Sequence, residues 1–230
     1  MKLEIVGLSF SYGPNIIFDN LNVEFENGRL NAILGPNGVG KTTLLKLIAG
    51  IIKPHNGSIL YNKQPLPKGS VAYVPQDNIL LPWLTLYSNV ELPLKIAGVD
   101  DDTRRLRVLK ALEATEVLHL SNRYPKHISG GERKRVAIAR ALASNAPIFL
   151  LDEPMANVDP SGREVIWRIL RGLSNEKLVI VVTHEISEAL MVGDLIYVMA
   201  GRPANIVEVL EGGEEAWARL KRIITLYYRQ

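Results

Sequence analysis

The chain has 230 residues, of which 47% are hydrophobic and 22% are charged, and its formal net charge is +3. This composition is typical of a folded chain with a large core, and the small charge surplus does not by itself indicate a nucleic-acid or membrane surface. The absence of cysteine excludes disulfides, thiolate metal sites and cysteine nucleophiles, and it fits a cytosolic setting. The apolar runs are too short to cross a bilayer, so we expect a soluble chain that serves a membrane only through a partner.

The first third of the chain is predicted to consist mainly of strands. Apolar and polar residues alternate in residues 2–10, 21–25 and 29–34, as they do in half-buried strands. The dipeptide Asn27-Gly28 lies between the last two segments and is typical of a tight hairpin turn. We therefore expect antiparallel pairing in this region.

A glycine-rich loop then separates the strand "LNAIL" from a helical pattern that ends at Gly50. The sequence "GPNGVGKT" fits the pattern G-x-x-x-x-G-K-[ST], in which backbone N–H groups surround a phosphate at the positive end of a helix. Lys41 is expected to reach the β and γ phosphates, and the Thr42 hydroxyl to bind Mg²⁺. The predicted nucleotide contacts are Gly35, Pro36, Asn37, Gly38, Val39, Gly40, Lys41, Thr42 and Thr43.

The middle of the chain changes character after a predicted strand at residues 69–76. Residues 77–100 are apolar and interrupted by proline, and they fit neither a clean strand nor a clean helix. Residues 101–120 are predicted to form a helix with an apolar face at Leu106, Leu109 and Leu112. The loop residues Ile79, Leu80, Leu81 and Trp83 have two interpretations, the core of a helical lobe or a docking surface for a partner.

Helices and buried strands alternate from residue 132 onward. Predicted helices at 132–144 and 160–173 alternate with apolar strands at 147–154 and 177–185, which predicts an α/β sheet. Residues 85–144 are expected to form an inserted helical lobe. The tail is predicted to be a helix that closes the core or contacts a partner, with an apolar stripe at Trp217, Leu220, Ile224 and Tyr227.

Several candidate catalytic side chains lie at predicted strand ends. Asp152 and Glu153 follow a buried strand, where open α/β sheets bind ligands; Asp152 is expected to hold Mg²⁺, and Glu153 to polarise the attacking water. His184 ends another apolar strand and is expected to reach the γ phosphate. The amide of Gln76 could bind Mg²⁺ and sense the water, and Tyr12 could stack on adenine. Each of these residues would be unremarkable alone.

A second glycine turn opens the predicted helix after residue 131. Ser129, Gly130 and Gly131 would offer a hydroxyl and backbone N–H groups at a helix start, which is again a predicted phosphate-binding site. One glycine-rich loop already accounts for one triphosphate. We therefore expect this turn to complete a site on a second copy, giving a symmetric dimer with two shared sites.

In the order of these motifs, residues 1–201 resemble the nucleotide-binding subunit of ATP-binding cassette (ABC) transporters. The resemblance is carried by Tyr12, the loop 35–43, Gln76, the turn "ISGGE", Asp152 with Glu153, "NVD" ending in Asp159, and His184. The family usually has LSGGQ and SALD, so Ile128, Glu132 and "ANVD" depart from its pattern. Glu132 is expected to bring a carboxylate near a shared phosphate, where it would weaken ATP affinity or alter signalling.

The resemblance implies an α/β fold. It consists of a P-loop NTPase core with a mostly parallel sheet, an N-terminal antiparallel β subdomain and an inserted α-helical lobe. The expected limits are 1–84 and 145–210 for the core with its β subdomain, 85–144 for the lobe and 211–230 for the C-terminal helix. The resemblance also implies ATP and Mg²⁺ as cofactors, Glu153 as catalytic base, and Asp159 as a residue near the nucleotide.

The implied partners are a second copy or a paralogous ATPase subunit, integral membrane permease subunits and, indirectly, an external solute-binding protein. No nucleic acid is expected, and the chain is expected to be peripheral at the cytoplasmic face of the membrane. The segments "LLPWLTLYSNV" and "GRPANIVEVLEG" resemble those of importers of nitrate, sulfonate and taurine. The alternatives are an exporter or lipoprotein-release ATPase, or a soluble ABC-type clamp, which would need a coiled coil or tandem cassettes that this sequence lacks.

Overall fold

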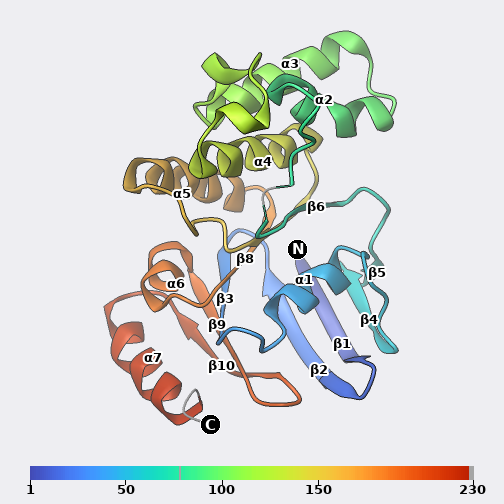
Figure 1. Ribbon diagram of the computed structural model, residues 1–230. Helices are drawn as coiled ribbons and strands as arrows, with labels where there is room; N and C mark the ends of the chain where they lie inside the picture. Colours follow the sequence, from blue (N-terminus) through green and yellow to red (C-terminus); the bar gives the residue numbers. More distant parts are fainter. Residues whose placement is uncertain (78, 228–230) are drawn as a thin grey trace.

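The computed structural model describes residues 1–77 and 79–227, with only the backbone described at 214 and 224–227. The chain forms two sheets beneath a group of helices (Figure 1). The first sheet is antiparallel and has the strand order β2-β1-β4-β5. Its strands are β1 (Lys2–Tyr12), β2 (Asn15–Glu26), β4 (Asn56–Tyr61) and β5 (Gln64–Pro65).

The second sheet has the order β10-β9-β3-β8-β7-β6. Its strands are β3 (Leu30–Leu34), β6 (Val71–Val74), β7 (Ile148–Asp152), β8 (Leu178–Thr183), β9 (Leu195–Ala200) and β10 (Asn205–Glu211). All neighbours are parallel except β10, which is antiparallel to β9. This topology confirms the predicted α/β core with its mostly parallel sheet and the antiparallel N-terminal sheet.

The expected pairing of segments 21–25 and 29–34 is wrong. β2 pairs with β1, whereas β3 crosses to the other sheet and lies between β8 and β9. The misleading residue is Asn31, whose polarity suggested an outward-facing position although it is fully buried. Its side-chain amide donates hydrogen bonds to the carbonyl oxygens of Glu26 and Val179. This buried, hydrogen-bonded side chain therefore fixes the crossover between the two sheets.

Helices cover both faces of the parallel sheet. On one face α1 (Lys41–Ile48) lies between the two sheets and packs Leu44, Leu45 and Leu47 into their shared core. On the other face lie α5 (Pro160–Ser174), α6 (Ile186–Val192) and α7 (Glu214–Tyr227). None of the helices in residues 1–77 and 79–227 is long and apolar enough to cross a membrane.

The remaining helices gather at one end of the molecule (Figure 1) and have a hydrophobic core of their own. They are α2 (Leu86–Ile96), α3 (Asp101–Ala114) and α4 (Gly130–Ser144), with 3-10 turns at Leu118–Leu120 and Pro125–His127. The irregular segment 77–100 therefore contains a helix, which Pro93 in its interior had obscured.

Two predicted apolar faces need correction. In α3 the buried residues are Val108, Ala111 and Leu112, whereas Leu106 is 54% exposed.

In α7 the buried residues are Ala216, Leu220 and Ile223, which pack against the parallel sheet's core. Trp217 is 41% exposed and lies off this stripe. The side chains of Ile224 and Tyr227 lie outside the described residues.

Candidate functional site

The glycine-rich loop connects the central strand β3 to α1, and it places Lys41 at the start of the helix. Gly40 adopts a φ of 120°, and a Cβ there would lie 2.8 Å from Ile17 Cγ2, so the loop needs glycine at this point. The buried Lys41 ammonium donates to the carbonyl oxygens of Gly35 at 2.8 Å and Pro36 at 3.0 Å. Burial lowers the pKa of Lys41, and the nearby carboxylates of Glu153 and Asp152 oppose this shift.

Asp152 is the last residue of β7 and is buried against the glycine-rich loop. The Tyr73 hydroxyl at the end of β6 donates to its Oδ2 atom at 3.3 Å. Burial raises the pKa of Asp152, while hydrogen bonds with Thr42 and Tyr73 oppose the rise. The influence of Thr42 on this pKa indicates that two of the expected magnesium ligands lie near each other.

Glu153 follows the strand in a left-handed conformation, with a φ of 46°, and its N–H donates to the Val182 carbonyl. Non-glycine residues in this region store backbone strain and are concentrated at functional sites. One carboxylate oxygen accepts from the Gln76 amide nitrogen at 3.0 Å. The other lies 2.8 Å from Nδ1 of His184. Gln76, Glu153 and His184 each follow a strand of the parallel sheet, and they meet at the Glu153 carboxylate.

These groups line a cleft of about 480 Å³. Its walls are Tyr12, Ile17, Asn37, Gly38, Gly40, Lys41, Thr42, Thr43, Gln76, Glu153 and His184. Tyr12 is half exposed and lies edge-on to Phe10. Of the other predicted contacts, Gly35 and Pro36 hold Lys41 through their carbonyls, and Val39 is buried in the core. Asp152 is buried and is not part of the cleft wall.

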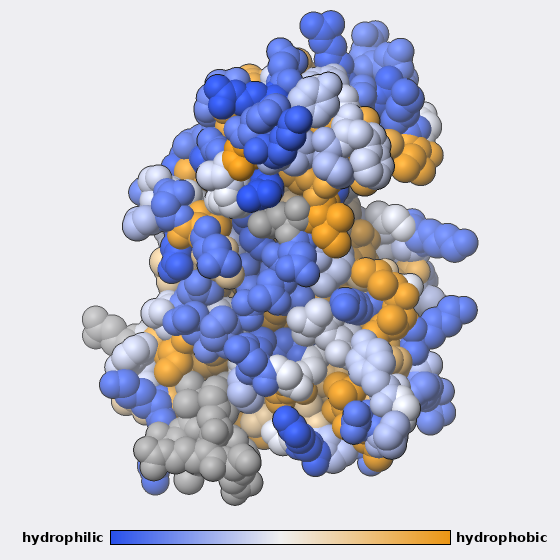
Figure 2. Space-filling model, in the orientation of Figure 1, coloured by the Kyte–Doolittle hydropathy of each residue, from blue (hydrophilic) through white to orange (hydrophobic). Residues whose placement is uncertain are grey.

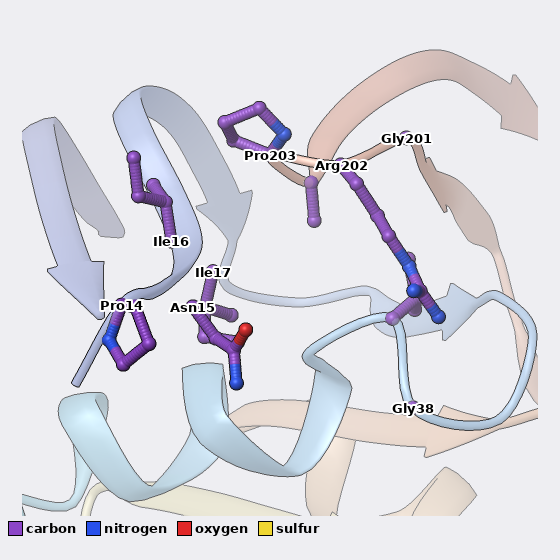
Figure 3. Close-up of a pocket in the computed structure, with 10 residues that line it drawn as sticks. Pro14, Asn15, Ile16, Ile17, Gly38, Gly201, Arg202 and Pro203 are labelled. Atoms are coloured by element: carbon purple, nitrogen blue, oxygen red, sulfur yellow. The ribbon is translucent and has the colours of Figure 1, made fainter. Parts of the chain in front are cut away.

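A neighbouring hollow of about 540 Å³ shares Ile17 and Gly38 with this cleft (Figure 3). It lies between the β1–β2 turn, the P-loop and the β9–β10 turn, and Figure 3 shows Arg202 extending from the last of these toward the P-loop. None of Gln76, Glu153 and His184 lines it. The chemistry described above therefore belongs to the first cleft.

The second glycine turn does not line the cleft. Ser129 is the N-cap of α4, and Ser129 and Gly130 are exposed. Asp159 is the N-cap of α5 and lies beside the turn, since a Cβ on Gly131 would be 3.4 Å from its Oδ2. The structure therefore groups Ser129, Gly130, Gly131 and Asp159 together, apart from the residues around Lys41.

The Glu132 carboxylate points back toward the N-cap of its own helix. It accepts from the Ser129 N–H at 2.7 Å, while Ser129 Oγ accepts from the Glu132 N–H at 3.2 Å, which completes a capping box. The carboxylate thus has a local structural partner.

Three residues near the cleft were missed from the sequence: Ile17, Tyr73 and Lys134. Tyr73 lies in β6, beside the strand that carries Asp152, so the parallel register could have indicated it. Ile17 belongs to a strand extension that the sequence pattern did not reveal. Lys134 belongs to a basic helix start, a pattern typical of a solvated face, yet it is buried, with 1% exposure.

The chain matches the family model described as ABC transporter over residues 18–156. It is 35% identical over 212 residues to the taurine import ATP-binding protein TauB of Yersinia pestis bv. Antiqua (strain Antiqua), covering 90% of this chain and 83% of that protein. It is 38% identical over 226 residues to the sulfate/thiosulfate import ATP-binding protein CysA of Bradyrhizobium diazoefficiens, covering 90% of this chain and 66% of that protein.

A solved dimeric bacterial ABC transporter cassette has a TM-score of 0.81 at 31% identity, covering 92% of this chain and 99% of that one. Its post-hydrolysis state, bound to ADP and Pi, has a TM-score of 0.80 at 31% identity and the same coverage. The chain therefore belongs to the ABC transporter family and is one of its ATPases.

Proposed function

We propose that this chain is the ATP-hydrolysing subunit of a membrane ABC transporter. In a head-to-tail dimer it would couple ATP binding and hydrolysis to the import of a solute. The observation that carries the proposal is the placement of Glu153, which is bonded to Gln76 and His184 beside the P-loop, while the glycine turn at 129–131 lies outside this cleft. A single subunit thus holds a catalytic half and a separate phosphate-binding half.

Within the cleft, Tyr12 is positioned to stack on adenine, and the P-loop N–H groups of residues 35–43 would surround the phosphates. Lys41 would exchange its two carbonyl partners for the β and γ phosphates. Thr42, Gln76 and Asp152 supply only oxygen ligands, which is the chemistry that Mg²⁺ prefers. Bound there, Mg²⁺ would neutralise phosphate charge.

For hydrolysis, Glu153 would accept a proton from a water whose oxygen bonds to the γ phosphorus as the bond to the β-phosphate oxygen breaks. The products are ADP, inorganic phosphate and a proton. His184 and Gln76 hold the two carboxylate oxygens of Glu153 and fix the direction of the remaining lone pairs. The amide oxygen of Gln76 remains the atom that would bind Mg²⁺.

The glycine turn would close on the ATP held by a partner subunit. The Ser129 hydroxyl can donate, and the first N–H groups of α4 are directed toward the helix start, where an anion is stabilised. Asp159 lies beside this turn and would face the same nucleotide. The resulting dimer is two-fold symmetric if both subunits are this chain, or pseudo-symmetric with a paralogous subunit.

The route to a membrane partner begins directly after Gln76. In the docking loop, which we define as residues 79–85, Ile79 is 63% exposed and Trp83 is 70% exposed, whereas Leu80 is buried in the lobe core. Figure 2 shows apolar side chains on this face where the helical lobe meets the sheets. Exposed apolar bulk of this kind is typical of a protein contact, and we assign it to the permease subunits.

The docking loop is held in place by side chains rather than by regular structure. The buried amide of Asn89 accepts from the Leu81 N–H and donates to the carbonyls of Leu81, Leu84 and Thr85. A fixed loop supports docking because little ordering entropy is lost on binding.

For the solute, we propose a small oxyanion such as taurine, a sulfonate or nitrate, delivered by an external solute-binding protein. The names of the taurine and sulfate/thiosulfate importers support this choice. The chain would then lie at the cytoplasmic face of the membrane, with residues 1–84 and 145–210 as catalytic core, 85–144 as lobe and 211–230 as terminal helix. Uptake of these anions by cells lacking the gene would separate an importer from an exporter.

The test is Mg-ATP hydrolysis by the purified chain as a function of protein concentration, with Glu153→Gln in parallel. We expect a more than linear rise for the wild type, because two subunits form each site. Glu153→Gln should lower kcat at least about 100-fold and accumulate as a dimer in ATP, measured by mass in solution. A rate linear in protein that survives Glu153→Gln would contradict the proposal.

A further inference from the structure

Lys134, in the second turn of α4, is a fully buried cation. Its side chain is 1% exposed, and its Nζ donates to the main-chain carbonyl of Gln76 at 2.9 Å. The carboxylates of Asp77, Asp152 and Glu153 lie close enough to favour its charge. Burying an ammonium group is costly, and an apolar residue of similar length would fill the space at lower cost. The cost of this buried charge indicates a role beyond packing.

Continuous hydrogen bonds lead from this cation to the catalytic carboxylate. Lys134 holds the carbonyl of Gln76, the Gln76 side chain donates to Glu153 at 3.0 Å, and Glu153 contacts His184 at 2.8 Å. At the other end, Lys134 lies one helical turn after Gly130 on α4, whose first turn is fixed by the capping box. The glycine turn and Glu153 are thus joined through one buried side chain.

We propose that Lys134 is a positioning residue that connects the two ATP sites of the dimer. When the glycine turn at residues 129–131 closes on the partner's nucleotide, α4 moves as a unit, and Lys134 draws the Gln76 backbone with it. Gln76 then sets the Glu153 carboxylate toward the nucleotide in this chain's own cleft. The inference rests on the proposed function, because it requires a turn that faces a partner's ATP.

Arg140 provides a matched control within the same helix. It also donates to a main-chain carbonyl, that of Ile79, at 2.9 Å, and so it also ties α4 to the segment that follows β6. No hydrogen bond described for Arg140 leads to Glu153. If Lys134 only fastened the lobe to the core, removal of either cation would have the same effect.

The experiment compares Lys134→Met, Arg140→Met, Gln76→Ala and the double variant Lys134→Met/Gln76→Ala with the wild type. Methionine retains the length and the burial but removes the donor and the charge. Thermal unfolding, the affinity of each monomer for a fluorescent ATP analogue, kcat, and the Hill coefficient for ATP are measured. A merely structural role would move the unfolding temperature together with kcat.

We expect Lys134→Met to unfold at or above the wild-type temperature and to bind nucleotide within about twofold of it. Its kcat should fall at least about tenfold, and its Hill coefficient should drop toward 1, whereas Arg140→Met should stay within about twofold in kcat. The double variant should be no slower than Gln76→Ala, because both changes break the same connection.

Equal losses in Lys134→Met and Arg140→Met, or fully multiplicative losses in the double variant, would overturn the inference. Failure of the proposed function has a different signature, a wild type whose ATP dependence is not cooperative. In that case the comparison of kcat values still decides whether Lys134 acts through Gln76.

Discussion

Glu132 stabilises the start of α4, although its place in the glycine turn suggests an effect on ATP binding. Its carboxylate is bound to the Ser129 N–H at the start of α4, and this hydrogen bond lowers the pKa of Glu132 below its usual value of 4.5. An acid at this position also complements the helix dipole. The departure from the usual glutamine is thus a local stabilising choice, and its effect on a shared phosphate is a separate question.

We predict that Glu132→Ala costs about 1 kcal/mol in the free energy of unfolding at neutral pH, and that Glu132→Gln costs less because its amide oxygen can still accept. Since the folded-state pKa is depressed, the charge stabilises the fold above pH 4.5 and ceases to do so as the pH falls through the folded-state value. Urea unfolding at neutral and acidic pH measures this difference. An Ala variant equal to the wild type at neutral pH would contradict the prediction.

At the residue scale the sequence indicated most of the cleft, because a P-loop and acids at strand ends have spacings that chemistry imposes. Lys41, Gln76, Glu153 and His184 meet in one place as those spacings predicted. Lys134 escaped notice because charge in a helix sequence is normally solvated. Only its tertiary neighbours show that its charge is buried.

At the scale of elements, amphipathic faces decide how the helices pack, and α7 gives a clear case. Leu220 is fully buried against the parallel sheet, whereas Trp217, three residues earlier, is 41% exposed and lies under the Lys221 ammonium at 4.9 Å. The face that docks is therefore that of Ala216, Leu220 and Ile223.

We predict that Leu220→Ala destabilises the protein by about 2–5 kcal/mol, because it leaves a cavity in the main core. Trp217→Ala is the control on the same helix and should cost less than about 1 kcal/mol. Chemical denaturation of both variants measures the difference. If Trp217→Ala were the more damaging change, the outer face of α7 would have a structural partner that the described contacts do not include.

Elements were predicted well where one period dominated the sequence, as in β7, β8, α4 and α5. They were predicted poorly where a single side chain disturbed the pattern. Asn31 made a buried central strand look half-exposed, and Pro93 hid a helix capped by Thr85. In both cases tertiary hydrogen bonds or packing outweighed the local preference.

At the scale of the whole molecule, the separation of the glycine turn from the P-loop cleft makes a mixed dimer informative. By the proposed function, a Lys41→Met subunit would lose the phosphate contact of its own cleft. A Gly130→Asp subunit would repel the partner's phosphate with little effect on the fold, because a Cβ on Gly130 meets no atom within 4 Å. Each variant alone has two damaged sites in its homodimer.

We predict that mixing the two variants restores measurable ATPase activity, up to about a quarter of the wild-type rate, since about half of the dimers are mixed and each of these holds one intact site. The Glu153 of that site belongs to the Gly130→Asp subunit, so loss of the connection through Lys134 would keep the rate below this limit. The measurement is steady-state hydrolysis at increasing ratios of one variant to the other, with each variant alone as control. If mixed dimers are detected by mass but activity does not recover, the P-loop and the glycine turn do not form a site shared between two subunits.

The buried crossover at Asn31 has a consequence for which nucleotide the chain accepts. Tyr12 ends a strand of the antiparallel sheet, and the P-loop follows a strand of the parallel one, while Asn31 locks the chain where it passes between the two sheets. Tyr12 and the P-loop are thus carried by two sheets that are joined through a buried, hydrogen-bonded crossover. With Tyr12 as the proposed adenine contact and the P-loop as the proposed phosphate contact, this frame would favour a nucleotide whose length from base to phosphate matches the separation of the two sheets' ends.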